Sequence, residues 1–547
     1  MARRTKIDET AGRWDRRFMP VGLGGNVSAR FITTAAVLAV SALALTGCAP
    51  GGAGTTGTSG GATTDTIAAA LGTDPSGFDP ALARAADDYI VARMLFDTVI
   101  RKDEDNTLVG GLATDWEALS ASSYSLTIRD DATCSDGSPI TATTVADSLT
   151  RFADPATAST GRTLAMGSAT AVFTADDDAG TVDVELSQDW ADFLTGLTLP
   201  AAGIVCAPGL ADTDGLLAGT VEGAFTGPYT LTSAEPAVSY ELALRDDYDA
   251  WPEFATPVEG TPAATVTYTP ISDQATLATQ ILSGGLDAGV FTGEAVERFD
   301  NDETYSQVSV AGLTSYLIFN EREGSVFADN LDLRRAVAQA VDPEAFTDVL
   351  TSGRGETISS VSSANVACVN TDASLLAGYD SEAASEVLAG ATIRLVGTNL
   401  FAAGNEYVAE VLRNAGATVE FQSLDNANWS TTTGAPSGWD VTVQGDINQM
   451  GTVTSSLLRV MGPASEDGGR NKMGLVNETG YAALNEAMAL VDPAEQCDAF
   501  QAAQESFLTN VDAAPLATVP YTTVMAEGFS IRSFGDYTDP STMRIVD

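Results

Sequence analysis

The sequence predicts an α/β protein with more than one sheet, and three observations indicate this class. Segments that alternate apolar and polar residues, as strands do, recur along the chain. Between them lie segments whose apolar residues have helical spacing. Residues 391–424 contain a strand, a helix and a second strand, which predicts a βαβ unit with parallel strands and a right-handed crossover.

The first half of the folded chain is expected to be rich in strands. The alternating segments lie at 124–129, 181–187, 239–245 and 264–270. A helix is predicted at 141–152, because Val145, Leu149 and Phe152 fall on one face and Thr141 can cap the N-terminus.

The βαβ unit gives the clearest prediction in the second half. Its strands are expected at 391–397 and 417–424, and its helix at 405–416. Gly416 suits the left-handed conformation that ends many helices. Further helices are predicted at 274–285, 331–342, 481–491 and 494–508.

Composition limits the classes of function. The chain has 547 residues, 44% of them hydrophobic, which predicts two or more domains with substantial cores. A net charge of -47 disfavours nucleic acid as a partner, because such a surface repels phosphate. The chain has no histidine, which excludes Ser-His-Asp and Cys-His nucleophiles and HExxH zinc sites. Carboxylate-pair chemistry, as in glycoside hydrolases, is compatible with this composition.

The first 64 residues have the pattern of an exported lipoprotein. An uncharged apolar run at 31–45 follows several Arg and Lys residues and is too short to span a membrane. It ends in Leu45, Thr46, Gly47 and Cys48, which resembles the bacterial lipobox. We therefore expect 1–48 to be a signal peptide with Cys48 as the lipidated residue, and the Gly-, Thr- and Ser-rich residues 49–64 to be a flexible tether.

Two alternatives for this segment stay open. One is an ordinary secretory cleavage with an incidental cysteine. The other concerns the export route, since Arg16-Arg17 hints at a twin-arginine signal but lies well before the apolar run.

Five cysteines are an odd number for an exported protein. Lipidation of Cys48 leaves Cys134, Cys206, Cys368 and Cys497. These four can pair in three ways, and the residues alone do not choose among them. Four unlinked thiols are the less favoured state in an oxidising compartment.

The order of motifs resembles the extracellular solute-binding proteins that serve oligopeptide, dipeptide and nickel ABC importers, known as solute-binding protein family 5. The resemblance covers 66–547. The matching positions are Leu112, Ala113 and Trp116, then Asp136, Gly137, Pro139, Thr141, Ala142 and Val145, then Gly-Pro-Tyr at 227–229, the helix exit at 280–290, the Phe-Asn strand and helix at 316–342, and the return crossing at 514–521.

This resemblance implies a bilobal periplasmic-binding-protein fold of type II, with two lobes around a ligand cleft. Lobe I would hold 65–268 and 515–547, with an extra subdomain near 95–180, and lobe II would hold 269–514. The pairing Cys134 with Cys206 and Cys368 with Cys497 is then favoured, because each bridge stays within one lobe and leaves the hinge free.

The resemblance also suggests ligand-binding residues in lobe II. In peptide binders of the family an acidic residue after a strand pairs with the ligand's α-ammonium, and Asp446 is nearest that role here, beside Trp439, Gln444 and Gly445. The surroundings depart from the usual Asp-x-x-Asp-Pro pattern, and a turn or N-cap role for Asp446 is an equal alternative. Trp439 is a candidate for the wall of the cleft, although most tryptophans at such places belong to the core.

Lobe I and the Phe-Asn strand supply the remaining candidates. Ser76, Gly77 and Phe78 lie where family members offer backbone groups to an extended ligand, although Gly77 also fits simple turn chemistry. Asn320 is a candidate hydrogen-bond donor to the ligand, with anchoring of a loop as the alternative.

The implied function is that of a substrate-binding lipoprotein of an ABC importer. We expect it to close on a small solute, with oligopeptide or dipeptide as first choice, and to deliver it to the permease without catalysing a reaction. Nickel is disfavoured because the chain has no imidazole, and neither a cofactor nor a metal is expected.

The protein is expected to be a monomer, anchored to the extracytoplasmic face of the cell membrane. The alternatives are a secreted glycoside hydrolase lipoprotein and a structural or signalling lipoprotein.

Overall fold

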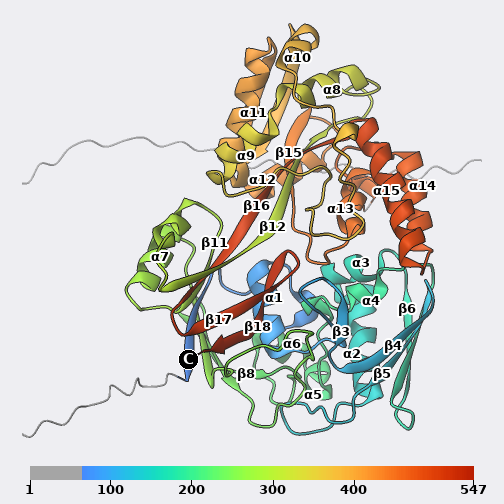
Figure 1. The fold of residues 1–547 in the computed structure, drawn as a ribbon. Coiled ribbons are helices and arrows are strands. Elements are labelled where there is room, and N and C mark those ends of the chain that lie inside the picture. Colours follow the sequence, from blue (N-terminus) through green and yellow to red (C-terminus); the bar gives the residue numbers. More distant parts are fainter. Residues whose placement is uncertain (1–64, 468, 547) are drawn as a thin grey trace, which may run out of the picture. The chain divides into compact units, whose positions relative to one another are not determined.

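The computed structural model describes residues 65–467 and 469–546, which form a mixed α/β fold with several sheets, as the sequence predicts (Figure 1). The strands are β1 (Thr66–Leu71), β2 (Ile100–Lys102), β3 (Leu108–Gly110), β4 (Ala113–Ser120), β5 (Ser123–Ile128), β6 (Ala171–Asp176), β7 (Thr181–Leu186), β8 (Tyr229–Glu235), β9 (Ser239–Leu244), β10 (Thr265–Pro270), β11 (Ala288–Phe291), β12 (Tyr305–Phe319), β13 (Thr392–Thr398), β14 (Thr418–Leu424), β15 (Val441–Asp446), β16 (Ala513–Ala526), β17 (Phe529–Phe534) and β18 (Tyr537–Ile545).

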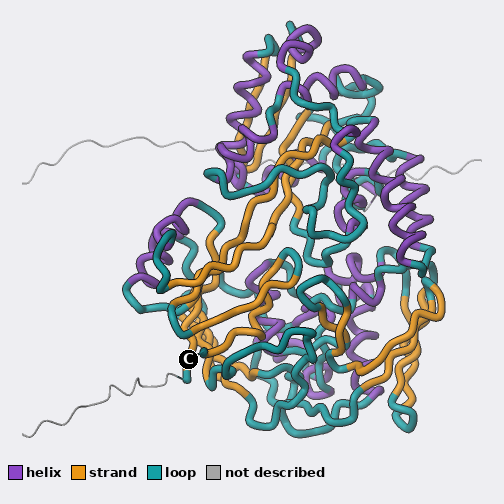
Figure 2. The backbone as a smooth tube through the Cα atoms, in the orientation of Figure 1, coloured by secondary structure: helices purple, strands orange, loops and turns teal. Residues whose placement is uncertain are grey.

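Helices lie between most of these strands (Figure 2). They are α1 (Ala86–Leu95), α2 (Ala142–Ala153), α3 (Thr160–Met166), α4 (Phe193–Gly196), α5 (Ala207–Ala211), α6 (Thr213–Ala218), α7 (Gln274–Leu282), α8 (Leu331–Ala340), α9 (Pro343–Thr351), α10 (Ser381–Leu388), α11 (Ala402–Asn414), α12 (Asn426–Gly434), α13 (Val453–Val460), α14 (Glu478–Met488) and α15 (Pro493–Thr509). Among the described residues, no helix is both long and apolar enough to cross a membrane.

A ten-stranded sheet has the order β14-β13-β15-β12-β16-β11-β1-β10-β9-β8. Its two central long strands, β12 and β16, are antiparallel and pair from Tyr305 with Ala526 to Ile318 with Ala513. Strand β15 pairs with one end of β12, at 314–319, whereas β11 pairs with the opposite end of β16, at 522–525. The ten-stranded sheet therefore extends along the two long strands, with different neighbouring strands at their two ends (Figure 1).

This order divides the described chain into two parts. We call residues 65–304 and 527–546 the first part, and residues 320–512 the second part; β12 and β16 cross between them. Segment 274–291, which the predicted boundary at 269 assigns to lobe II, ends in β11, and β11 pairs with β1 as well as β16. The predicted lobe boundaries, including the one at 269, stay a prediction.

The first part contains a separate four-stranded antiparallel sheet, β4-β5-β7-β6. Helix α2 packs on it, and Val145, Leu149 and Phe152 are buried as the helical spacing predicts. The Thr141 side chain accepts a hydrogen bond from the N–H of Thr144, so it caps α2 as expected.

The second part contains the predicted βαβ unit. Strands β13 and β14 are parallel, from Thr392 with Thr418 to Thr398 with Leu424. Helix α11 begins three residues earlier than predicted, at Ala402, directly after a short turn at 399–401. Gly416 has φ of +95° just after the helix, a conformation that glycine adopts without steric cost.

Two disulfide bonds join the four cysteines of the described chain as the favoured pairing predicts. Cys134 is bonded to Cys206 in the first part, and Cys368 to Cys497 in the second part. Neither bridge links the two parts. The predicted signal peptide, Cys48 and tether lie outside the described residues.

Candidate functional site

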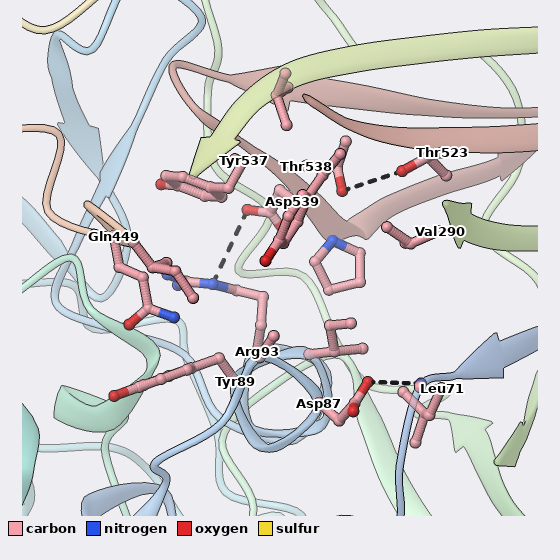
Figure 3. A pocket seen from close by; sticks show the side chains of 18 of the residues that line it. Leu71, Asp87, Tyr89, Arg93, Val290, Gln449, Thr523, Tyr537, Thr538 and Asp539 are labelled. Carbon is pink, nitrogen blue, oxygen red and sulfur yellow. Dashed lines mark hydrogen bonds and ion pairs between the residues drawn. The ribbon is translucent and has the colours of Figure 1, made fainter. Parts of the chain in front are cut away.

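A cavity of about 180 Å³ lies where the first part, the crossing strands and the second part meet (Figure 3). The first part contributes Tyr89, Ile90, Arg93, Thr198, Tyr537 and Asp539. The crossing strands contribute Val310, Gly312, Tyr521 and Thr523. The second part contributes Ile447, Asn448 and Gln449. Mostly apolar side chains with a few polar groups are typical of a site for a small ligand.

Helix α1 forms one wall of the cavity, and two acidic residues fix its start. Asp88 accepts hydrogen bonds from Ser76 and from the backbone N–H groups of Arg84 and Ala85. Asp87 accepts from the N–H groups of Gly72 and Thr73 and from the Thr73 hydroxyl. Carboxylates in a first helical turn are favourable because they face the positive end of the helix dipole. The loop after β1 is thereby held against the helix.

A buried network of opposite charges holds α1 against β18. Arg101 donates to Asp539 at 2.5 Å and lies 3.6 Å from Asp97. Arg93 lies 4.0 Å from Asp539 and donates to the Thr98 hydroxyl and to the Thr198 carbonyl oxygen. Burial acts to raise the pKa of Asp539, but the two guanidinium groups outweigh it and lower the pKa overall. Figure 3 shows the Arg93–Asp539 pair beside the cavity.

The pKa of Asp97, in the same network, is shifted in the opposite direction. Burial raises its pKa to about 6, although Arg101 and the hydroxyl of Tyr248 act to lower it. Tyr248 donates to Asp97 at 2.8 Å. The network therefore combines one firmly ionised carboxylate with one that takes up a proton in mildly acidic solution.

The crossing strand β12 is irregular where it reaches the cavity. Its pairing with β16 shifts between Gly312 and Leu313, which marks a β-bulge. Gly312 has φ of +55°, and a Cβ atom there would lie 2.6 Å from the ring of Tyr521. Glycine therefore permits both the local backbone and the position of Tyr521.

The second part reaches the cavity through one short loop after β15, residues 447–452. Asn448 organises the loop, since its amide donates to the Thr452 carbonyl oxygen and accepts from the N–H of Gly451. Ile447 is 44% exposed although it is apolar. The loop thus presents an apolar side chain and the Gln449 amide to the cavity.

The two parts touch beside this cavity through polar contacts. The hydroxyl of Ser363 donates to Asp536 at 2.6 Å, at the tip of the β17–β18 hairpin. The Ala191 N–H donates to the Met488 carbonyl oxygen at 3.0 Å, and the Lys102 ammonium donates to the Met450 carbonyl oxygen. These contacts hold the second part against the first.

The predicted segment 76–78 lies away from the cavity lining. Ser76 is bound to Asp88, and Phe78 is buried against Tyr240 with its N–H donating to the Leu217 carbonyl oxygen. Gly77 approaches Leu217 closely. Their contact with a ligand stays a prediction.

Asn320 and Trp439 lie together inside the second part. The Asn320 amide donates to the carbonyl oxygens of Pro436 and Trp439, which is the loop-anchoring arrangement. Trp439 is fully buried, and its indole N–H donates to the Ala435 carbonyl oxygen. Neither residue lines the cavity.

Gln444, Gly445 and Asp446 form the end of β15, directly before the cavity loop. Asp446 is 1% exposed and accepts from Arg459 at 2.6 Å, with Arg470 at 3.9 Å. Gln444 is buried and donates to the Gly445 carbonyl oxygen. Both arginine contacts are to the Oδ1 atom of Asp446, and its Oδ2 atom has no hydrogen-bond partner among the described residues. The contact of Asp446 with a ligand stays a prediction.

Sequence reasoning missed the residues that line the cavity. Asn448 and Gln449 follow the predicted residue Asp446 by two and three positions, but neither was singled out. Tyr89, Arg93 and Tyr537 carry no motif and are far apart along the chain. Only the packing of α1 against β18 reveals that they share a site. Within 65–467 and 469–546, no cluster of three or more acidic or cysteine side chains is placed to hold a metal ion.

The family model for bacterial extracellular solute-binding proteins, family 5, matches residues 107–465. The chain belongs to this family. The match covers the four-stranded sheet, β12 and most of the second part. It confirms the resemblance seen in the motifs and gives no support to the glycoside hydrolase alternative.

Two curated proteins of Escherichia coli (strain K12) are similar to this solute-binding protein. The periplasmic murein peptide-binding protein is 35% identical over 86 residues, which is 16% of each chain. The probable D,D-dipeptide-binding periplasmic protein is 25% identical over 305 residues, which cover 52% of this chain and 54% of the relative. The chain therefore matches only part of the length of these two relatives.

Solved structures are similar over most of the chain. A substrate-binding protein from Microbacterium hydrocarbonoxydans, complexed with 4-hydroxybenzoate hydrazide, is 39% identical with a TM-score of 0.75, covering 88% of this chain and 100% of that one. A dipeptide-binding protein from Pseudoalteromonas sp. SM9913, complexed with Met-Leu, is 17% identical with a TM-score of 0.72, covering 88% and 100%. The second likeness concerns the fold alone.

Proposed function

We propose that this protein is the solute-binding component of an ABC importer, which captures a small organic solute in the cavity by closure of its two parts and delivers it to the permease. Family membership carries this proposal. Peptides are the class named for both curated relatives, and a short peptide is the class predicted from the sequence. The protein binds and releases its ligand without catalysing a reaction.

The arrangement of the cavity supports capture by closure. Residues from both parts line it, and among the described strands β12 and β16 are the two that cross between the parts. Two strands with a bulge at Gly312 form a narrow connection that can bend. Polar contacts such as Ser363 to Asp536 then stabilise the closed arrangement.

The lobes and the anchor belong to the same proposal. Lobe I, at 65–268 and 515–547 with a subdomain near 95–180, and lobe II, at 269–514, are the two bodies that close on the solute. Cys48 carries the lipid that holds the protein on the extracytoplasmic face of the cell membrane, and 49–64 lets the binding domain reach the permease. The protein acts as a monomer.

Mass spectrometry tests the function directly. The full chain is purified without refolding and then denatured, and we expect it to release a stoichiometric small organic molecule. Hydrolysis of a glycan by the purified protein, lost on a single Glu→Gln change, would overturn the proposal. A full-length Cys48→Ser variant should appear in the medium with ligand binding intact, and its continued retention in the membrane would contradict lipid anchoring.

A further inference from the structure

The size of the cavity restricts the ligand. Its volume is about 180 Å³. An engineered apolar cavity of about 150 Å³ holds one benzene molecule, whereas sites for drug-sized ligands span roughly 300 to 1,000 Å³. The cavity therefore has room for one aromatic ring with a few further atoms, and little room for an extended peptide.

Every charged side chain of the cavity lining is already paired. Asp87 accepts three hydrogen bonds from residues 72–73. Asp536 accepts from Ser363 and Asn365. Asp539 pairs with Arg101. Arg93, the one cationic side chain of the described lining, lies 4.0 Å from Asp539 and donates to the Thr98 hydroxyl and the Thr198 carbonyl oxygen, while its Nε atom makes no hydrogen bond within the described chain.

Paired charges of this kind favour an uncharged ligand. A ligand ammonium or carboxylate would lose its hydration in the cavity without gaining a free counter-ion. A carboxylate would also be repelled by a chain with a net charge of -47. The two charged ends of a free dipeptide would both be unfavourable here.

The groups that remain for a ligand are apolar or neutral. Ile90, Val310 and the exposed Ile447 supply aliphatic contacts. Tyr521 and Tyr537 line the cavity, and within the described chain the hydroxyl of neither residue makes a hydrogen bond. Gln449 likewise keeps its side-chain amide unpaired among the described residues. These groups match an aromatic ring that carries neutral N–H and C=O groups.

From this geometry we infer that the ligand is a compact, uncharged aromatic amide or hydrazide, held by Gln449, Tyr521 and Tyr537 around its polar end. The inference rests on the proposed function as a solute receptor and names its substrate class. It agrees with the aromatic hydrazide bound to the Microbacterium hydrocarbonoxydans protein, which is 39% identical.

Thermal unfolding and calorimetry of the full chain test this inference with two probes, 4-hydroxybenzoate hydrazide and the dipeptide Met-Leu. The hydrazide at about one hundred times its Kd should raise Tm by about 3 °C. Met-Leu should bind at least about a hundredfold more weakly, because its charged ends lack partners. Tighter binding of Met-Leu than of the hydrazide would overturn the inference and leave the receptor function intact. No shift with either probe, and no solute released from the native protein, would overturn both.

Substitutions of Gln449 and Tyr537 test whether these side chains contact the ligand. Gln449→Ala and Tyr537→Phe should each weaken binding of the hydrazide about fivefold, the effect of one lost neutral hydrogen bond. The matched control is Tyr379→Phe, which alters an exposed tyrosine of the second part and should leave Kd unchanged. Equal affinity in Gln449→Ala, Tyr537→Phe and the control, with Tm of the free proteins unchanged, would contradict the assigned contacts.

Discussion

The two walls of the cavity are built differently. In the first part, Tyr89, Arg93, Tyr537 and Asp539 stand on a helix and a strand that a buried ion network joins. In the second part, a single loop, 447–449, reaches the cavity. A wall fixed before the ligand arrives loses little entropy on binding, whereas a loop can close over what is already bound. We therefore expect the first wall to be formed before the ligand binds, and the loop of the second part to move when the two parts close.

The largest expected effect comes from the ion network of the first wall. Arg101→Met leaves Asp539 and Asp97 buried without their main counter-charge, and we expect it to lower the free energy of unfolding by about 3 to 5 kcal/mol. Denaturant unfolding measures this loss. Arg129→Met is the control, because the partner Asp131 is exposed and such pairs contribute about 0 to 1 kcal/mol. Equal losses of unfolding free energy in Arg101→Met and Arg129→Met would show that the ion network does not stabilise the first wall.

The pH dependence of stability should differ between the two parts. In the second part, burial raises the pKa of Glu321 to about 8, with Asp512 adding to the effect and Arg334 opposing it. The folded protein therefore keeps a proton that the unfolded chain releases, and the free energy of unfolding falls as pH rises from about 4.5 to 8. The pKa of Asp97 in the first part is also raised, so this residue likewise lowers the free energy of unfolding as pH rises. Its contribution ends near pH 6, because its pKa in the folded protein is about 6.

Glu321→Gln tests this difference, because a neutral amide cannot release the proton. We expect the decline in the free energy of unfolding between pH 6 and 8 to become shallower in this variant, as measured by denaturant unfolding at each pH. Glu420→Gln, at an exposed position of β14, should keep the wild-type slope. A Glu321→Gln protein with an unchanged slope would show that Glu321 is ionised throughout this range.

A smaller effect is expected at the crossing strand between the walls. Gly312→Ala forces a side chain into a backbone with φ of +55° and against Tyr521, and should cost about 2 kcal/mol of stability. It should also weaken ligand binding, because Tyr521 must move. The control is Gly284→Ala, where φ is +71° but nothing lies within 4 Å of the new Cβ atom. Calorimetric Kd values unchanged in both variants would show that Tyr521 takes no part in binding.

The smallest expected effect concerns closure. Ser363→Ala removes the hydrogen bond to Asp536 between the two parts, which contributes about 1 kcal/mol. We expect about fivefold weaker ligand binding with the unfolding midpoint almost unchanged. Ser359→Ala removes a hydrogen bond to the Asn370 carbonyl oxygen within the second part, and should leave Kd unaltered. A Ser363→Ala protein with wild-type affinity would show that this contact does not stabilise the closed state.

Elements with a local signal were predicted well. Thr141 and the face of Val145, Leu149 and Phe152 define α2 through contacts three to seven residues apart. The start of α11 was missed, because the turn at 399–401 before it has no clear breaker residue. Local hydrogen bonding and side-chain periodicity explain both the success and the small error.

The site could not be predicted in the same way. Asp446 has the residue type expected for a ligand ammonium, and its contact with a ligand stays a prediction; only the fold shows that Arg459 of α13 binds one oxygen of its carboxylate. Tyr89 and Tyr537 line one cavity although they are 448 positions apart in the sequence. Single residues brought together over such separations leave no pattern in the sequence.

The sequence by itself determined the α/β class, the family, and most helices and strands, because periodicity, caps and ordered motifs act over short stretches of chain. The tertiary structure decided where the cavity lies, which carboxylates are paired, and which neutral groups remain for a ligand. These depend on β12 and β16 crossing between the two parts and on α1 packing against β18. Contacts between distant segments arise only when the whole chain folds, and they select the chemistry of the site.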